Sequence, residues 1–163
     1  MKKTIVVLPF ILAAADQAIK ALVRRVPQGH VFLRVEPFFE LTHYTNTGAA
    51  FSLFSGNPMA IGLMTLLLLA ALFMVLRGLN LSARAWFALA CLTGGGLGNL
   101  IDRLLLGGVT DYIHLLPVRF PVFNFADICI TLSIGYLMIQ MLRGRLELPT
   151  EEGHEPGQQE RRG

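Results

Sequence analysis

Four long apolar stretches constrain this chain more than any other feature of its sequence. They cover residues 4–23, 59–76, 85–106 and 123–142. An α-helix rises about 1.5 Å per residue, so each stretch is long enough to cross a hydrocarbon layer of roughly 30 Å. A soluble bundle of four such helices would have no polar face to present to water. The pattern therefore predicts an all-α membrane protein with four transmembrane helices.

The composition agrees with a membrane protein and argues against several other classes. Hydrophobic residues make up 53% of the chain and charged residues only 15%. Such a chain is neither disordered nor fibrous, and its net charge of +3 comes from scattered Lys and Arg rather than a basic face for nucleic acid. Cys91 and Cys129 lie far apart in apolar runs. We therefore expect no disulfide framework and no metal site.

Positive charges at the ends of the apolar stretches predict the orientation. If the N-terminus is cytoplasmic, the cytoplasmic flanks carry Lys2, Lys3, Arg77, Arg84, Arg143, Arg145, Arg161 and Arg162. The opposite side then carries Arg24, Arg25, Arg34 and Arg119. Lys and Arg are enriched in cytoplasmic loops, so this bias favours both termini in the cytoplasm. We expect a multi-pass membrane protein.

The connection at residues 24–58 has strand-like character. Apolar and polar residues alternate at 31–35 and 40–44, as they do in half-buried strands. We expect a small β-sheet, formed by about residues 28–56, on the outer face of the membrane. Residues 109–114 predict another short strand.

The chain is expected to form one integral membrane domain, residues 1–146. Its first stretch could pass for a cleavable leader, but Asp16, Gln17 and Lys20 stand where a cleavage site needs small residues, so we expect a retained helix. Residues 147–163 are rich in Glu, Gly, Pro and Gln, which predicts a disordered cytoplasmic tail.

Polar residues inside the apolar stretches mark the candidate site. Ionisable side chains are costly in a membrane and usually indicate function. Here they occur at spacings of three or four residues, which put each group on one helix face. The groups are Asp16 with Lys20, Asn99 with Asp102 and Arg103, and Asn124 with Asp127. From the helix rise they lie about 18–26 Å above the inner helix ends, so one polar layer is expected near the outer surface, within reach of Asp111.

The chemistry of this layer is that of carboxylates. It contains no His, and the chain has no HExxH motif, which disfavours a zinc protease. The reaction that these groups support best is one in which two carboxylates share a proton and activate a water molecule. The alternative is a small proton- or ion-coupled transporter subunit, because Asp and Lys in helices also form proton relays. A relay needs polar groups through the whole depth, and the inner halves of the stretches carry few.

Five motifs resemble, in order, those of bacterial lipoprotein signal peptidase (signal peptidase II) over roughly residues 4–142. They are Asp16-Gln17-x-x-Lys20, Asn46-Thr47-Gly48-Ala49-Ala50-Phe51-Ser52, Gly95-x-x-Gly98-Asn99-Leu100-Ile101-Asp102-Arg103, Val109-Thr110-Asp111-Tyr112-Ile113 and Phe123-Asn124-Phe125-Ala126-Asp127. The resemblance implies an aspartic endopeptidase of the bacterial inner membrane that cuts prolipoproteins before the diacylglyceryl-modified cysteine, without metal or cofactor. It further implies membrane lipid and globomycin-type inhibitors as partners, and we expect a monomer.

The resemblance also assigns roles to individual residues. It implies that Asp111 and Asp127 are the catalytic pair. It implies substrate binding or structural support for Asp16, Lys20, Asn46, Gly48, Asn99, Asp102, Arg103, Asn124 and Ala126. Thr110, Tyr112 and Phe125 depart from the residues common in the family, which affects only the expected fit of the substrate.

The surroundings of the other polar residues separate anchors from reacting groups. Asp102, with Arg103 beside it, is expected to be a structural anchor, and so is Asp16 with Lys20. The glycines at 94–98 are expected to allow close helix packing. We predict that the segment around Asn46 lines the site and that its side chain hydrogen-bonds the substrate backbone; an ordinary turn is the alternative.

Overall fold

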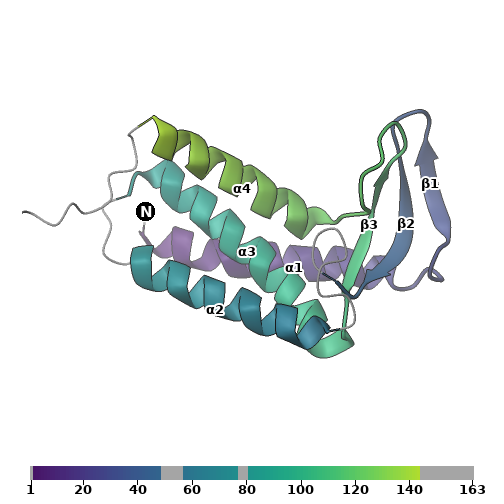
Figure 1. Ribbon diagram of the computed structural model, residues 1–163, viewed down its shortest axis with the longest axis horizontal. Coiled ribbons are helices and arrows are strands. Elements are labelled where there is room, and N and C mark those ends of the chain that lie inside the picture. The colour runs from purple at the N-terminus through teal and green to yellow at the C-terminus, as the bar shows by residue number, and fades with distance from the viewer. Residues whose placement is uncertain (1, 49–56, 77–80, 144–163) are drawn as a thin grey trace, which may run out of the picture.

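The computed structural model describes residues 2–48, 57–76 and 81–143. Its helices are α1 (Lys2–Val23), α2 (Pro58–Leu76), α3 (Ala83–Leu106) and α4 (Phe125–Leu142). They form an elongated bundle with a β-sheet at one end (Figure 1). Each helix begins and ends within two residues of the apolar stretch that predicted it. The predicted tail, residues 147–163, lies outside the described residues.

Three helices are long and apolar enough to cross a membrane. They are α1 over Val6–Val23, α3 and α4, while α2 contributes a shorter apolar segment, Pro58–Met74. Large apolar side chains face outward along the bundle: Phe73 is 71% exposed and Leu132 is 69% exposed. Such a surface suits lipid rather than water. The chain is therefore a multi-pass membrane protein, and the count of four spans stays a prediction.

Helix α3 packs against each of the other three helices. Glycine allows the closest approaches, as expected for this part of α3. A Cβ atom at Gly95 would lie 2.5 Å from the backbone oxygen of Ala126, and one at Gly98 would lie 2.5 Å from the Asp16 carboxylate. Any side chain at these positions would push α4 or α1 away. The glycines thus set the helix spacing at the end of the bundle near the sheet.

The sheet has three antiparallel strands in the order β1 (Val31–Val35), β2 (Phe39–Asn46) and β3 (Val109–Leu115). The expectation of a sheet confined to about residues 28–56 is therefore incomplete, because β3 follows α3. Strand propensity identified each strand locally, but only the fold brings β3 beside β2. Glu40 on β2 joins all three strands, since its carboxylate accepts hydrogen bonds from Arg34 at 2.9 Å and binds His114 at 2.9 Å.

The path of the chain gathers several helix ends beside the sheet. Helices α1 and α3 run toward it, and α4 starts from it and runs back (Figure 1). Helix α3 ends at Gly107, whose φ of 71° turns the chain into β3. Helix α4 begins at the N-cap Asn124, whose side chain accepts a hydrogen bond from the backbone of Asp127. The polar residues of three helices consequently lie at one end of the bundle.

Candidate active site

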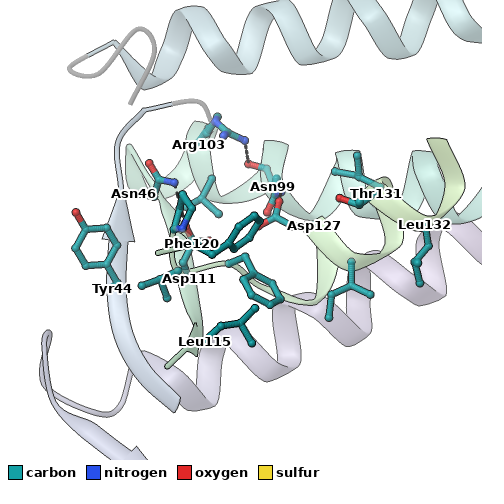
Figure 2. A pocket seen from close by; sticks show the side chains of 16 residues that line it. Tyr44, Asn46, Asn99, Arg103, Asp111, Leu115, Phe120, Asp127, Thr131 and Leu132 are labelled. Atoms are coloured by element: carbon teal, nitrogen blue, oxygen red, sulfur yellow. Dashed lines mark hydrogen bonds between the residues drawn. The ribbon is translucent and has the colours of Figure 1, made fainter. Parts of the chain in front are cut away.

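The predicted site residues meet where the bundle joins the sheet. Five of them line one cavity of about 790 Å³: Asn46, Asn99, Arg103, Asp111 and Asp127. Asp16, Lys20 and Asp102 lie behind it, each no more than 1% exposed. Figure 2 shows Asn46, Asp111 and Asp127 around the same space, with Phe120 beside them. The polar layer expected from helix spacing therefore consists of two adjoining parts.

Asp111 projects from β3 and is held by neutral amides. One carboxylate oxygen accepts a hydrogen bond from Asn46 at 3.0 Å, and the other accepts one from Asn124 at 2.6 Å. The side chain is 1% exposed. Burial, and after it the negative charge of Asp127, raises the pKa of Asp111 to about 7. A carboxyl group in this position can carry a proton near neutral pH.

Asp127 lies in the first turn of α4 and faces the same cavity. One oxygen accepts a hydrogen bond from the Asn99 side chain at 2.8 Å, and the other accepts one from the backbone N–H of Asn124 at 3.2 Å. The second contact completes a capping box, in which side chain and backbone of the two residues bind each other. The capping box at the start of α4 therefore fixes the direction of the Asp127 side chain.

Two asparagines connect the two aspartates. Asn124 donates from one amide group both to Asp111 and to the Asn99 oxygen, the latter at 3.1 Å. Asn99 in turn donates to Asp127 and accepts a hydrogen bond from Lys20 at 2.8 Å. An amide can donate and accept at once, which lets it bridge acidic groups without neutralising them. Among the described residues neither aspartate forms an ion pair.

A buried ion cluster lies behind the cavity and consists of Asp16, Lys20, Arg24 and Asp102. The Lys20 ammonium lies 2.8 Å from Asp16 and 3.4 Å from Asp102, and its side chain is fully buried. Arg24 lies 3.3 Å from the other oxygen of Asp102. Each acid also accepts a hydrogen bond from a backbone N–H group, that of Ala126 for Asp16 and that of Thr110 for Asp102. These acids join α1, α3, β3 and α4.

The expected partnership of Asp102 with Arg103 is wrong. Neighbouring residues on a helix point in different directions, so Asp102 faces α1 while Arg103 faces the cavity. The guanidinium of Arg103 donates to the backbone oxygens of Asn99 at 3.3 Å and Gly48 at 3.5 Å. Its Nε has no acceptor among the described residues. Arg103 thus lines the cavity while this nitrogen is buried.

The remaining predicted residues also lie at the junction. Asn46 donates to Asp111 and accepts from the backbone N–H of Gly48 at 3.0 Å, so its polar atoms already have partners within the chain. Ala126 is fully buried where Asp16 meets α4. The predicted lining segment continues over residues 49–52, which lie outside the described residues. A direct contact of Asn46 with substrate stays a prediction.

Two residues that contact Asp102, Gln17 and Arg24, are not among the predicted site residues. Gln17 donates to Asp102 at 2.9 Å and to the backbone of Gly98 at 3.0 Å. Arg24 binds both Asp102 and the hydroxyl of Thr110. A signal was present, because Gln17, Lys20 and Arg24 are spaced by three and four residues and share one face of α1. From the sequence, Arg24 is interpreted only as a positive charge that follows the first apolar stretch.

The rest of the cavity wall is mostly apolar, apart from the hydroxyl groups of Tyr44 and Thr131. The apolar part comes from β3, from the connection between β3 and α4, and from α4 itself. The apolar lining residues include Leu115, Phe120, Pro121, Val122, Phe123, Ile128, Ile130 and Leu132. Phe120 and Phe123 contact each other edge to face, with ring centroids 5.6 Å apart. The cavity thus combines a carboxylate pair with an apolar surface that extends along α4.

The chain is similar in sequence to a known protein family and to several of its members. The model of the family described as signal peptidase (SPase) II matches residues 8–143. A lipoprotein signal peptidase of Streptococcus pneumoniae is 33% identical over 147 residues, covering 88% of this chain and 96% of the relative. One of Nostoc punctiforme is 35% identical over 150 residues, covering 88% and 90%.

Two solved structures described as bacterial membrane enzymes have the same fold. One superposes with a TM-score of 0.81 at 26% identity and covers 96% of this chain and 95% of its own. The other has a TM-score of 0.77 at 28% identity and covers 86% and 94%. The polar junction described above lies within the part of the chain that these comparisons cover. This chain belongs to the signal peptidase II family, the lipoprotein signal peptidases.

Proposed function

We propose that this chain is an aspartic endopeptidase that cuts prolipoproteins before a diacylglyceryl-modified cysteine, with Asp111 and Asp127 as its catalytic pair. Membership of the family makes it a peptidase that removes lipoprotein signal peptides. One observation carries the aspartic mechanism. The two carboxylates share a cavity and are held by amides rather than by cations, so a proton can pass to or from them.

The chemistry needs one protonated and one ionised carboxyl group. The ionised group takes a proton from water as the oxygen attacks the scissile carbonyl carbon, while the protonated group donates to the carbonyl oxygen. The resulting diol collapses when the leaving nitrogen receives a proton and the carbon–nitrogen bond breaks. Asp111 suits the protonated role, because burial and Asp127 raise its pKa to about 7. Asp127 at the N-terminal turn of α4 suits the ionised role.

Other groups around the cavity fit a lipid-modified peptide. The guanidinium group of Arg103, a residue that lines the cavity, can donate to a peptide carbonyl of the substrate. The apolar wall along α4 can receive an acyl chain, and globomycin-type inhibitors would occupy the same cavity. Lipid surrounds the helices, and the chain acts as a monomer. Membership of a peptidase family argues against the alternative of a transporter subunit.

The proposed location follows from the same geometry. Four spans with both termini in the cytoplasm would place the cavity near the outer face of the inner membrane, where a lipid-modified cysteine lies. Residues 1–146 would form the membrane domain. Reporter fusions after Leu81 and Met141 should report cytoplasm, and those near Gly29 and Pro117 the outer side. The reverse pattern would overturn the orientation.

The reaction itself can be tested directly. Purified protein in detergent is incubated with a diacylglyceryl-modified prolipoprotein, and the products are separated on a gel. Cleavage should appear only with the lipid-modified substrate, and mass spectrometry should place the new N-terminus at the modified cysteine. A well-folded sample that leaves the substrate intact would overturn the proposal, and equal cleavage of an unmodified substrate would overturn its lipid specificity.

A further inference from the structure

Arg24 lies just beyond the end of α1 and reaches two other elements at once. Its side chain is 28% exposed, and one terminal nitrogen lies 3.3 Å from Asp102 on α3. The same nitrogen donates to the hydroxyl of Thr110 on β3 at 3.1 Å. Asp102 also accepts a hydrogen bond from the backbone N–H of Thr110 at 2.8 Å. Arg24, Asp102 and Thr110 therefore form a closed three-way contact.

This contact fixes the strand immediately before Asp111. Side chains alternate across a strand, so Thr110 faces the helices on the side opposite to Asp111. On the other flank, the hydroxyl of Tyr112 accepts a hydrogen bond from the backbone N–H of Phe125 at 3.1 Å. Both neighbours of Asp111 are thereby tied to helices. A shift of β3 would carry the Asp111 carboxyl away from the groups of α4.

Asp102 has partners besides Arg24. Lys20 lies 3.4 Å from it, and Gln17 donates to it at 2.9 Å. Arg24 is also the one cation of the cluster that is partly exposed, whereas Lys20 is fully buried. Arg24 therefore shares the compensation of buried charge with Lys20, and it is the cation of the cluster that connects Asp102 to β3.

We propose that Arg24 is a positioning residue that holds β3 so that the Asp111 carboxyl meets Asn124 and Asp127. This inference rests on the proposed function, since it assigns Arg24 to the reaction of that carboxylate pair. Reacting groups must be placed within a fraction of an ångström, and a displacement of about 1 Å can cost on the order of 100-fold in rate. Arg24 acts through Thr110 and touches no group of the cavity.

The kinetic test compares Arg24→Gln and Thr110→Val with Arg25→Gln. Arg25 is the neighbouring exposed arginine and forms no ion pair within the described part of the chain, so its variant makes the same charge change without breaking the contact. We expect kcat to fall about 10- to 100-fold in Arg24→Gln, with little change in KM. Thr110→Val should lower kcat by a smaller factor, and the double variant should be no slower than Arg24→Gln.

Several outcomes would overturn the positioning role. They are an unchanged kcat in both variants, a loss confined to KM, or an equal loss in Arg25→Gln. Independent, multiplying losses in the double variant would also contradict a shared contact. If Arg24→Gln does not fold, Thr110→Val decides alone, because it removes one hydroxyl and leaves the pair of Arg24 with Asp102 in place.

A second readout does not depend on cleavage. The Asp111 carboxyl is titrated by infrared difference spectroscopy, its band assigned by its absence in Asp111→Asn. The charged groups near it are Asp127 from α4, Lys20 from α1 and Arg103 from α3. In Arg24→Gln the Asp111 titration should move to lower pH, as the carboxyl leaves Asp127 and gains water. An unmoved titration would overturn the positioning role, whereas a wild-type protein that does not cleave would overturn only the proposed function.

Discussion

The two parts of the polar junction hold their carboxylates in opposite ways. In the buried ion cluster, Asp16 and Asp102 are paired with Lys20 and Arg24 at 2.8–3.4 Å. At the cavity, Asp111 and Asp127 are held by the amides of asparagines at 2.6–3.0 Å. Asn99 joins the two parts, because its oxygen binds Lys20 while its nitrogen binds Asp127.

The difference separates two uses of the same side chain. A carboxylate beside a buried cation is stabilised in its charged form, and removing either partner leaves a costly unpaired charge. A carboxylate held by amides keeps its hydrogen bonds but gains no compensating charge, so it can change protonation. The cluster is therefore suited to joining helices, and the cavity pair is suited to moving protons.

The largest expected effect is on cleavage by Asp111→Asn and Asp127→Asn. An amide has nearly the same shape as a carboxylate but neither accepts nor supplies the proton. Each variant should lose on the order of 10⁴-fold in single-turnover rate while remaining folded in detergent.

Asp16→Asn and Asp102→Asn are the matched controls for that comparison. They change the same side chain in the ion cluster and should lower the unfolding temperature while leaving measurable turnover with enzyme in excess. Clear residual cleavage by Asp111→Asn or Asp127→Asn, from a sample free of wild type, would show that the wrong pair has been chosen.

The next largest effect is on stability and concerns Lys20→Met. Removing the ammonium leaves Asp16 and Asp102 buried with one shared cation fewer, which should cost about 3–5 kcal/mol in the free energy of unfolding. The measurement is unfolding in mixed detergent micelles. Adding Asp102→Asn to Lys20→Met should recover part of the loss, because one buried charge disappears. A double variant less stable than Lys20→Met would contradict the cluster's role as paired charges.

A third effect depends on pH. The folded pKa of Asp111, raised by burial and then by Asp127, is about 7; the unfolded value is about 3.9. Between these two pKa values the Asp111 carboxyl is protonated in the folded protein and ionised in the unfolded protein. The stability that Asp111 contributes is therefore greatest below pH about 4 and is lost as pH rises to about 7. Wild type should therefore lose stability relative to Asp111→Asn across this window, measured as unfolding temperature in detergent.

The same ionisation should limit the reaction. Above pH about 7 the proton on Asp111 is lost from the free enzyme, and kcat/KM should fall by about tenfold per pH unit. A rate that keeps rising through pH 8 would contradict a protonated Asp111 in the working enzyme.

The smallest expected effect comes from Tyr112→Phe, which removes only a hydroxyl. Burial raises the pKa of Tyr112 to about 12, so the hydroxyl stays neutral and accepts from the first turn of α4. Its loss leaves the Phe125 N–H unpaired and should cost about 1 kcal/mol in unfolding free energy. Thermal unfolding and kcat are measured together. A large fall in kcat together with only a small loss of unfolding free energy would mean that Tyr112 positions β3, as proposed for Arg24.

The helices and the identity of most site residues could be predicted from sequence, because both leave local signals. Apolar runs give helix bounds, and spacings of three and four residues show which polar side chains share a face. Asn99 and Asp102 were correctly placed in one layer with Asp127 by this argument. The sheet could be predicted only in part, because the strand patterns at 31–35 and 109–114 carry no information about which strand pairs with which.

Local sequence patterns therefore predict four apolar helices, one polar end of the bundle and the residues that lie there. How those residues pair with one another depends on the packing of the helices and the sheet. Asp102 binds Lys20 and Arg24 rather than its sequence neighbour Arg103, and Asp111 meets asparagines from two other elements. The physical reason is that periodicity fixes a side chain's direction on its own helix, whereas its partner depends on how closely glycines such as Gly98 let the helices approach.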